Sequence, residues 1–176
     1  NKIVTRTVTP DSEVQAIVDV AKVKVRPIAN RPVGTISADI PRAQVPSGES
    51  PLGNLIADSQ LAATTGNGAV LALMNPGGVR ADLTFPSSTE GEGNGVATYG
   101  EVFTVQPFGN ILQTVTLTGA NIKTVLEQQF SAARTFVLQP SAGLKYSWSA
   151  SAPFGSRISG VTLNGAPLDP AASYRV

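Results

Sequence analysis

An uninterrupted apolar segment, AVLALM at residues 69–74, limits the folds that this chain of 176 residues can adopt. Turn-forming residues bound the segment, with Gly66 before it and the sequence NPGG directly after it. A short apolar run between turn signals predicts a β-strand that is covered on both faces. Other elements must then pack on the strand in layers, and a chain with 41% hydrophobic residues can form such a core.

Two helices are predicted before this strand. Thr9 can cap the first helix, Pro10 suits its first turn, and apolar residues at three- and four-residue spacing continue to Arg26, after which Pro27 is expected to end it. The helix is either a connector between two domains or the first helix of this domain. A second helix is expected to begin at Ser50 and Pro51, with a core-facing side formed by Leu52, Leu55, Ile56 and Leu61.

Two further helices follow the strand. Thr98 and Glu101 have the spacing of a capping box, which predicts a short helix from Tyr99 to about Val105. Thr118 can cap a later helix whose apolar face is formed by Ile122, Val125, Leu126 and Phe130. Between the strand and these helices lies SSTEGEGNG, a low-complexity loop whose role the sequence leaves open.

Strand-like patterns separate the helices. They occur at residues 1–9, 31–40 and 111–117, and again after residue 143, where Asn164 and Gly165 form a strong hairpin-turn signal. The alternation of strands and helices predicts an α+β fold, with a mixed sheet and helices packed in layers.

Composition excludes several functions. Charged residues are 14% of the chain and the formal net charge is +1, so a basic surface for a nucleic acid polymer is not expected. The chain has no histidine and no cysteine, which removes the usual zinc, copper and iron ligands. Any metal held here would need carboxylate and carbonyl oxygens. No apolar run is long enough for a membrane span.

The sequence NPGGVR at residues 75–80 is a candidate binding loop. Pro76 ends the ladder of strand hydrogen bonds, and Gly77 and Gly78 can adopt positive φ and let a ligand approach the backbone N–H groups. Arg80 offers a planar fork of donors for phosphate or carboxylate, and the carboxamide of Asn75 can donate and accept. The alternative is a plain tight turn followed by a surface arginine.

The sequence QPFGN contains a second candidate. Phe108 lies between a proline and a glycine, where it can act as a stacking platform for a planar ligand. Alternatively, Phe108 closes the end of the core, and Asn110 is a turn residue.

No catalytic centre emerges from the residues. The acidic side chains of Glu49, Asp58, Asp82, Glu101 and Glu127 are spread along the chain and form no evident pair. A serine nucleophile would lack a histidine base, and no phosphate-binding lysine motif is present. A free-standing carboxylate enzyme is therefore disfavoured, and the chain is predicted to bind a ligand without catalysing a reaction alone.

Three segments in this order strongly resemble the C-terminal domain of the 5′-nucleotidase family: GESPLGNLIADSQL, NPGGVRADL and TYGEVFTVQPFGNILQTVTLTGANIKTVLE. The family includes UDP-sugar hydrolases, 2′,3′-cyclic nucleotide phosphodiesterases and ecto-5′-nucleotidase. The resemblance runs from about Arg31 to Val176. Three motifs in register are much more specific than any one of them.

The resemblance implies a division of labour between two domains. An N-terminal metallophosphoesterase domain, outside this chain, would hold two divalent metal ions and perform the hydrolysis. Residues 1–30 would be the tail of that domain and a connecting helix, and residues 31–176 the substrate-binding domain. The expected partners are a nucleotide or nucleoside and the N-terminal domain itself. The fragment alone would be inactive, and its location would be extracytoplasmic.

The same resemblance implies the roles of particular residues. Asn75 and Arg80 match substrate-contacting residues of the family, Phe108 matches one of two aromatic residues that enclose the base, and Asn110 lies near the base edge. The further residues implied are Gly77, Gly78, Gly143 and Arg42.

One departure from the family pattern is large. The family continues beyond the position of Val176 into a segment with a second stacking phenylalanine and a GGDG turn, so the domain is expected to be truncated here. With one face of the base uncovered, the predicted affinity for a nucleoside is millimolar at most. A non-catalytic ligand-binding or surface-interaction module with the same fold is the alternative function.

Overall fold

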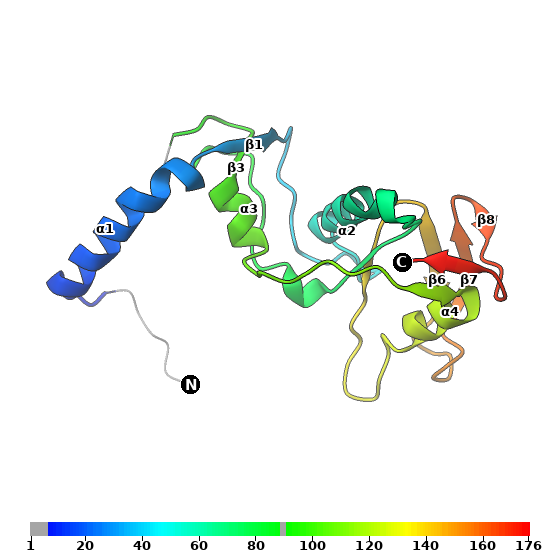
Figure 1. Cartoon of the computed structure of the whole chain (residues 1–176). Coiled ribbons are helices and arrows are strands. Elements are labelled where there is room, and N and C mark those ends of the chain that lie inside the picture. The colour runs from blue at the N-terminus through cyan, green and yellow to red at the C-terminus, as the bar shows by residue number, and fades with distance from the viewer. Residues whose placement is uncertain (1–6, 89–90) are drawn as a thin grey trace.

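The computed structural model describes residues 7–88 and 91–176, which form an elongated molecule with a projecting N-terminal helix (Figure 1). The predicted strand at residues 1–9 lies mostly outside the described residues. Within them, no helix combines the length and the apolar character that crossing a membrane requires.

The projecting helix, α1 (Ser12–Ala29), begins and ends later than predicted. Asp11 is the N-cap, because its carboxylate accepts hydrogen bonds from the backbone N–H groups of Glu13 and Val14 at 3.0 and 3.1 Å. The prediction that Pro27 ends the helix is wrong: Pro27 lies inside the last turn. Proline removes one N–H donor, but the turn still closes because the N–H of Asn30 donates to the carbonyl of Arg26 at 2.9 Å.

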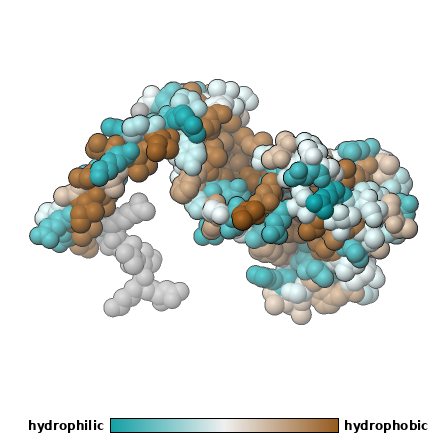
Figure 2. All heavy atoms as spheres, in the orientation of Figure 1, coloured by the Kyte–Doolittle hydropathy of each residue, from teal (hydrophilic) through white to brown (hydrophobic). Residues whose placement is uncertain are grey.

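None of the side chains of α1 is buried against the part of the chain that the structure describes. Its large apolar residues are exposed: Val14, Ile17, Val18, Val20, Val23, Val25 and Ile28. Figure 2 shows this hydrophobic surface along the projecting helix α1. An exposed apolar surface of this extent marks an interaction site in most soluble proteins.

The predicted short helix, α3 (Tyr99–Val105), is confirmed with its capping box. The Thr98 hydroxyl accepts from the N–H of Glu101 at 3.3 Å, and the Glu101 carboxylate accepts from the N–H of Thr98 at 2.8 Å. The helix follows β3 (Val96–Thr98), which pairs antiparallel with β1 (Pro32–Thr35). The strand predicted at residues 31–40 is shorter than expected, since Ile40 makes only an isolated bridge to Leu83.

Helix α2 (Pro51–Thr64) begins as predicted, because the Ser50 hydroxyl accepts from the N–H of Gly53 at 3.0 Å. Leu52 and Ile56 are buried, but Leu55 is 45% exposed, which corrects its predicted place in the core. A 3-10 turn, η1 (Thr65–Asn67), follows. The side of α2 that is buried contributes to the first core cluster, formed by Leu52, Ile56, Ala57, Met74, Val79, Leu83, Ala97 and Val105.

The apolar segment 69–74 is extended and largely buried, although Val70 is 40% exposed. Only its end, β2 (Leu73–Met74), belongs to a regular ladder, where it pairs antiparallel with β5 (Gln139–Pro140). Earlier in the segment, the N–H of Val70 donates to the carbonyl of Arg175, and that of Ala72 to the Ser141 hydroxyl. These partners lie on different segments, so the expected strand is regular only at residues 73–74.

The C-terminal half surrounds α4 (Gly119–Glu127), which Thr118 caps as predicted by accepting from the N–H of Asn121 at 3.1 Å. Its strands are β4 (Thr116–Thr118) paired with β9 (Ser173–Arg175), and a sheet of β6 (Leu144–Trp148), β7 (Ile158–Leu163) and β8 (Ala166–Pro167). The strand predicted at residues 111–117 is reduced to its end, and Ile111 is exposed.

The hairpin turn at Asn164 and Gly165 is confirmed, with φ values of 52° and 83°. The second core cluster joins α4 to the strands around it through Leu71, Ile122, Leu126, Phe130, Leu144 and Ile158. The α+β class is thereby confirmed, and the strands of the described residues are divided among four small antiparallel sheets.

Candidate ligand-binding site

The NPGG sequence forms a 3-10 turn, η2 (Pro76–Gly78), at the end of β2. Asn75 caps this turn, because its side-chain oxygen accepts from the N–H of Gly77 at 3.1 Å. The carboxamide nitrogen of Asn75 carries the donors that remain for a ligand. Pro76 occupies the first position of the turn, where its missing N–H costs no hydrogen bond.

The two glycines of the turn do not have the backbone conformation that was predicted for them. Neither Gly77 nor Gly78 has a positive φ, so the expected left-handed backbone is absent at both positions. A Cβ atom on Gly78 would instead overlap Cε of Met74, whereas one on Gly77 would lie 3.5 Å from the Asn75 side-chain oxygen, an ordinary contact. A side chain at residue 78 would therefore require the flexible end of Met74 to move.

We expect Gly78→Ala to destabilise the protein by about 1 kcal/mol, because the added methyl group forces only the flexible end of the buried Met74 side chain to move. Urea unfolding of Gly78→Ala, Met74→Ala and the double variant would measure the coupling between the two positions. The double variant should lose less stability than the sum of the two single variants. Strictly additive losses would contradict the packing explanation, and Gly77→Ala serves as the matched control.

A cleft of about 580 Å³ lies on one side of this turn. Of the eight residues predicted to contact a ligand, it brings together five: Asn75, Gly77, Gly78, Phe108 and Asn110. Phe108 is 47% exposed, so it does not close the end of the core. Its ring is available as one wall of the cleft.

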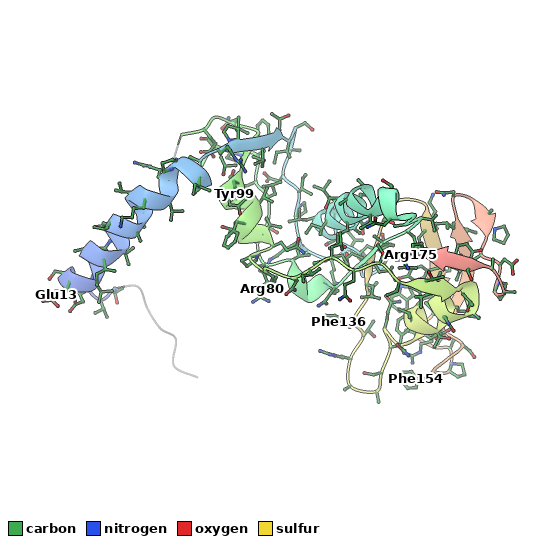
Figure 3. All side chains as sticks on the ribbon, in the orientation of Figure 1. Glu13, Arg80, Tyr99, Phe136, Phe154 and Arg175 are labelled. Atoms are coloured by element: carbon green, nitrogen blue, oxygen red, sulfur yellow. The ribbon has the colours of Figure 1, made fainter. Side chains whose placement is uncertain are left out.

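A second cleft of about 570 Å³ borders the same turn, and Gly77 lines both clefts. Arg42 lies in this second cleft, where its backbone N–H donates to the Asp82 carboxylate at 2.7 Å. Phe136 also lines it, with the guanidinium of Arg134 5.0 Å from the ring centroid. In Figure 3, Phe136 and Arg80 lie below the centre of the molecule and above Phe154.

Arg80 is exposed and lies at the C-terminal end of α3, since its N–H donates to the carbonyl of Val105 at 2.8 Å. Its guanidinium donates to the carbonyl of Gly77 at 3.2 Å. This bond holds the Arg80 side chain against the turn that separates the two clefts. Arg80 is thus near the site without lining either cleft.

Gly143 lies apart from the other predicted residues, in a cleft of about 460 Å³ beside Lys145 and Tyr146. It has a φ of 97°, and a Cβ atom here would overlap the side-chain oxygen of Asn164. Burial raises the pKa of Tyr146, whose hydroxyl donates to Gln129 at 3.3 Å. The requirement for glycine at 143 thus follows from the adjoining hairpin turn.

Sequence reasoning missed most of the residues that line the two clefts, among them Gln60, Gln106 and Phe136. Gln60 lies on α2 and Gln106 caps the C-terminus of α3. Neutral glutamines on helices carry no pattern that distinguishes a cleft from an ordinary surface. Phe136 lies in an irregular segment without a motif, so only the tertiary structure locates it.

The described part of the chain contains no group of three or more Asp, Glu, His or Cys side chains that could hold a metal ion. With no histidine anywhere in the sequence, the residues present do not fit a two-metal hydrolytic centre. The clefts offer groups that bind and orient a ligand.

Comparison with known proteins identifies the domain. The family described as "5′-nucleotidase, C-terminal domain" matches residues 28–176. The chain is 35% identical to "Cell wall protein Lmo0130" of Listeria monocytogenes over 98% of its own length and 23% of that protein. It is 34% identical to "Trifunctional nucleotide phosphoesterase protein YfkN" of Bacillus subtilis, over 93% of its length and 11% of that protein.

The fold is also that of a solved relative. The crystal structure of a 5′-nucleotidase precursor from Thermus thermophilus matches 96% of this chain and 33% of its own, with a TM-score of 0.76 and 33% identity. The chain therefore spans a third or less of the length of these relatives. With its motifs, its fold and the family match in agreement, the chain belongs to the 5′-nucleotidase family as a C-terminal domain.

Proposed function

We propose that this chain is the nucleoside-binding part of a two-domain, metal-dependent phosphohydrolase that acts on nucleotide phosphate esters. The observation that carries the proposal is the cleft beside the NPGG turn, which gathers Asn75, Phe108 and Asn110 from separate parts of the sequence. Its half-exposed aromatic ring and carboxamides match the needs of a planar heterocycle with polar edges.

Each predicted residue has a role in this proposal. Phe108 stacks on the base, and Asn75 and Asn110 hydrogen-bond its polar groups. Arg80 and Arg42 lie outside that cleft and hold the ribose or phosphate end of the ligand. Gly77 and Gly78 have no side chain that would project from the turn towards the ligand, and Gly143 shapes a neighbouring loop.

Hydrolysis belongs to a preceding metallophosphoesterase domain in this proposal, and two divalent metal ions there supply the chemistry. Residues 1–30 then connect the domains, and residues 31–176 bind the substrate. The exposed apolar side of α1 supports a contact with the preceding domain. We also infer an extracytoplasmic location, which the names "cell wall protein" and "5′-nucleotidase precursor" among the relatives support.

The proposal predicts a division of activity between two proteins. The longer protein that contains this chain should hydrolyse AMP, a UDP-sugar or a 2′,3′-cyclic nucleotide, whereas the 176-residue chain should bind adenosine with a millimolar Kd and release no phosphate. Phosphate release and calorimetric titration measure the two properties. Hydrolysis by the chain alone would contradict the proposal, whereas a micromolar Kd would contradict only the predicted weak affinity. Binding without hydrolysis by the longer protein would indicate a non-catalytic binding module.

A further inference from the structure

The cleft beside Phe108 has an unusual chemical composition, and we call it the carboxamide cleft. Its polar side chains are all carboxamides, and no charged side chain lines it among the described residues. The four carboxamides belong to Gln60, Asn75, Gln106 and Asn110. The second cleft, across the turn, is lined by the charged residues Arg42 and Asp82. The turn thus separates a neutral cleft from a charged one.

Gln60 and Gln106 share a weak acceptor at the floor of the carboxamide cleft. Both side-chain nitrogens donate to the thioether of Met74, at N···S distances of 3.3 and 3.6 Å. Sulfur is a poor acceptor, so these bonds cost little to exchange for bonds to a ligand. Within residues 7–88 and 91–176, neither glutamine oxygen accepts a hydrogen bond. Both amides are therefore ready to turn towards a ligand.

From these observations, and resting on the proposed function, we infer that Gln60 and Gln106 are specificity-determining residues that make the cleft tolerant of bases with opposite edge polarity. A carboxamide carries a donor and an acceptor, and rotation about its terminal bond exchanges them. It can therefore pair with a 6-amino group beside an acceptor, or with a 6-oxo group beside an N–H. A carboxylate only accepts and a guanidinium only donates, so either could satisfy only one of the two polar groups on each edge.

Adenosine and inosine test this inference, because they differ at the 6-position and in the protonation of the neighbouring ring nitrogen. The 176-residue chain, titrated with each nucleoside by NMR, should show Kd values within about threefold of each other. Gln60→Met and Gln106→Met should each weaken both nucleosides by about fivefold, the effect of one lost hydrogen bond. Methionine keeps a similar volume, and circular dichroism would check that the variants fold.

Gln106→Glu provides the sharper measurement. The carboxylate can accept from the 6-amino group of adenosine or from the ring N–H of inosine, but it repels the acceptor beside that donor, so both nucleosides should weaken by at least about threefold. The matched controls are Gln128→Met and Gln128→Glu, at an exposed residue that caps α4 and does not line the cleft. These controls should leave both Kd values unchanged.

The possible outcomes distinguish a failure of this inference from a failure of the proposed function. If both nucleosides bind but differ more than about tenfold, or if the glutamine variants behave like the Gln128 controls, the inference is wrong while the proposed function stands. If neither nucleoside binds at about 20 mM, the proposed function fails and the inference fails with it. Similar affinities that fall in both methionine variants would support the inference.

Discussion

Replacing Gln139 by alanine should lower the free energy of unfolding by about 3–5 kcal/mol. The side chain is fully buried, and its oxygen accepts from the N–H of Ser50 at 2.5 Å. Its nitrogen donates to the carbonyls of Gly48 and Val137 at 3.1 and 2.8 Å. Alanine would leave these backbone groups without their partner and would open a cavity, so both costs add.

Urea unfolding of three variants would test this expectation. Gln139→Met fills most of the volume but supplies none of the hydrogen bonds, so it should recover only the cavity part of the loss. Gln128→Ala, at an exposed position, should change stability by no more than about 0.5 kcal/mol. A loss for Gln139→Ala as small as that for Gln128→Ala would show that the buried network contributes little.

The position of Gln139 links stability to the candidate site. Gln139 is opposite Met74 in the pairing of β5 with β2, and β2 leads directly into Asn75. Ser50, whose backbone N–H donates to the Gln139 side chain, lines the second cleft. Replacing Gln139 by alanine should therefore displace residues that line both clefts. Binding of a nucleoside should then weaken as the stability of the domain falls.

Features determined by neighbouring residues were predictable from the sequence. The capping box of Thr98 and Glu101 fixed the start of α3, and the Asn164–Gly165 pair fixed a hairpin turn. In both cases the partners lie within a few residues of each other, so the interaction is present in the local sequence. The family resemblance added what local patterns lacked, the expectation that Asn75, Phe108 and Asn110 share a site.

Features determined by distant partners were not predictable. The extent of the strand at residues 69–74 depends on Arg175 and Ser141, which lie far along the chain. The contact that a side chain at residue 78 would make is with Met74, because the end of that side chain occupies the space beside the turn. Gln60 and Gln106 join the site only because α2 and the end of α3 meet at Met74.

Replacing Phe108 by alanine should weaken the binding of adenosine by at least about fivefold. A millimolar Kd corresponds to about 4 kcal/mol, and stacking on an aromatic ring contributes about 1–3 kcal/mol of that. The loss is then a large fraction of the total binding energy. Because the ring is 47% exposed, we expect the stability of the domain to change by less than about 1 kcal/mol. NMR titration measures the first effect and urea unfolding the second.

Phe154→Ala is the matched control for this prediction. Phe154 is 56% exposed, and the guanidinium carbon of Arg157 lies 4.1 Å from the centroid of its ring. It lies far from Arg80 in Figure 3. Its removal deletes the same ring without touching the carboxamide cleft, so the Kd for adenosine should not change. Phe108→Leu keeps apolar area but loses the flat π face, and should bind nearly as weakly as the alanine variant. Wild-type affinity in Phe108→Leu would show that the cleft recognises apolar contact alone, and equal effects of Phe108→Ala and Phe154→Ala would remove Phe108 from the site.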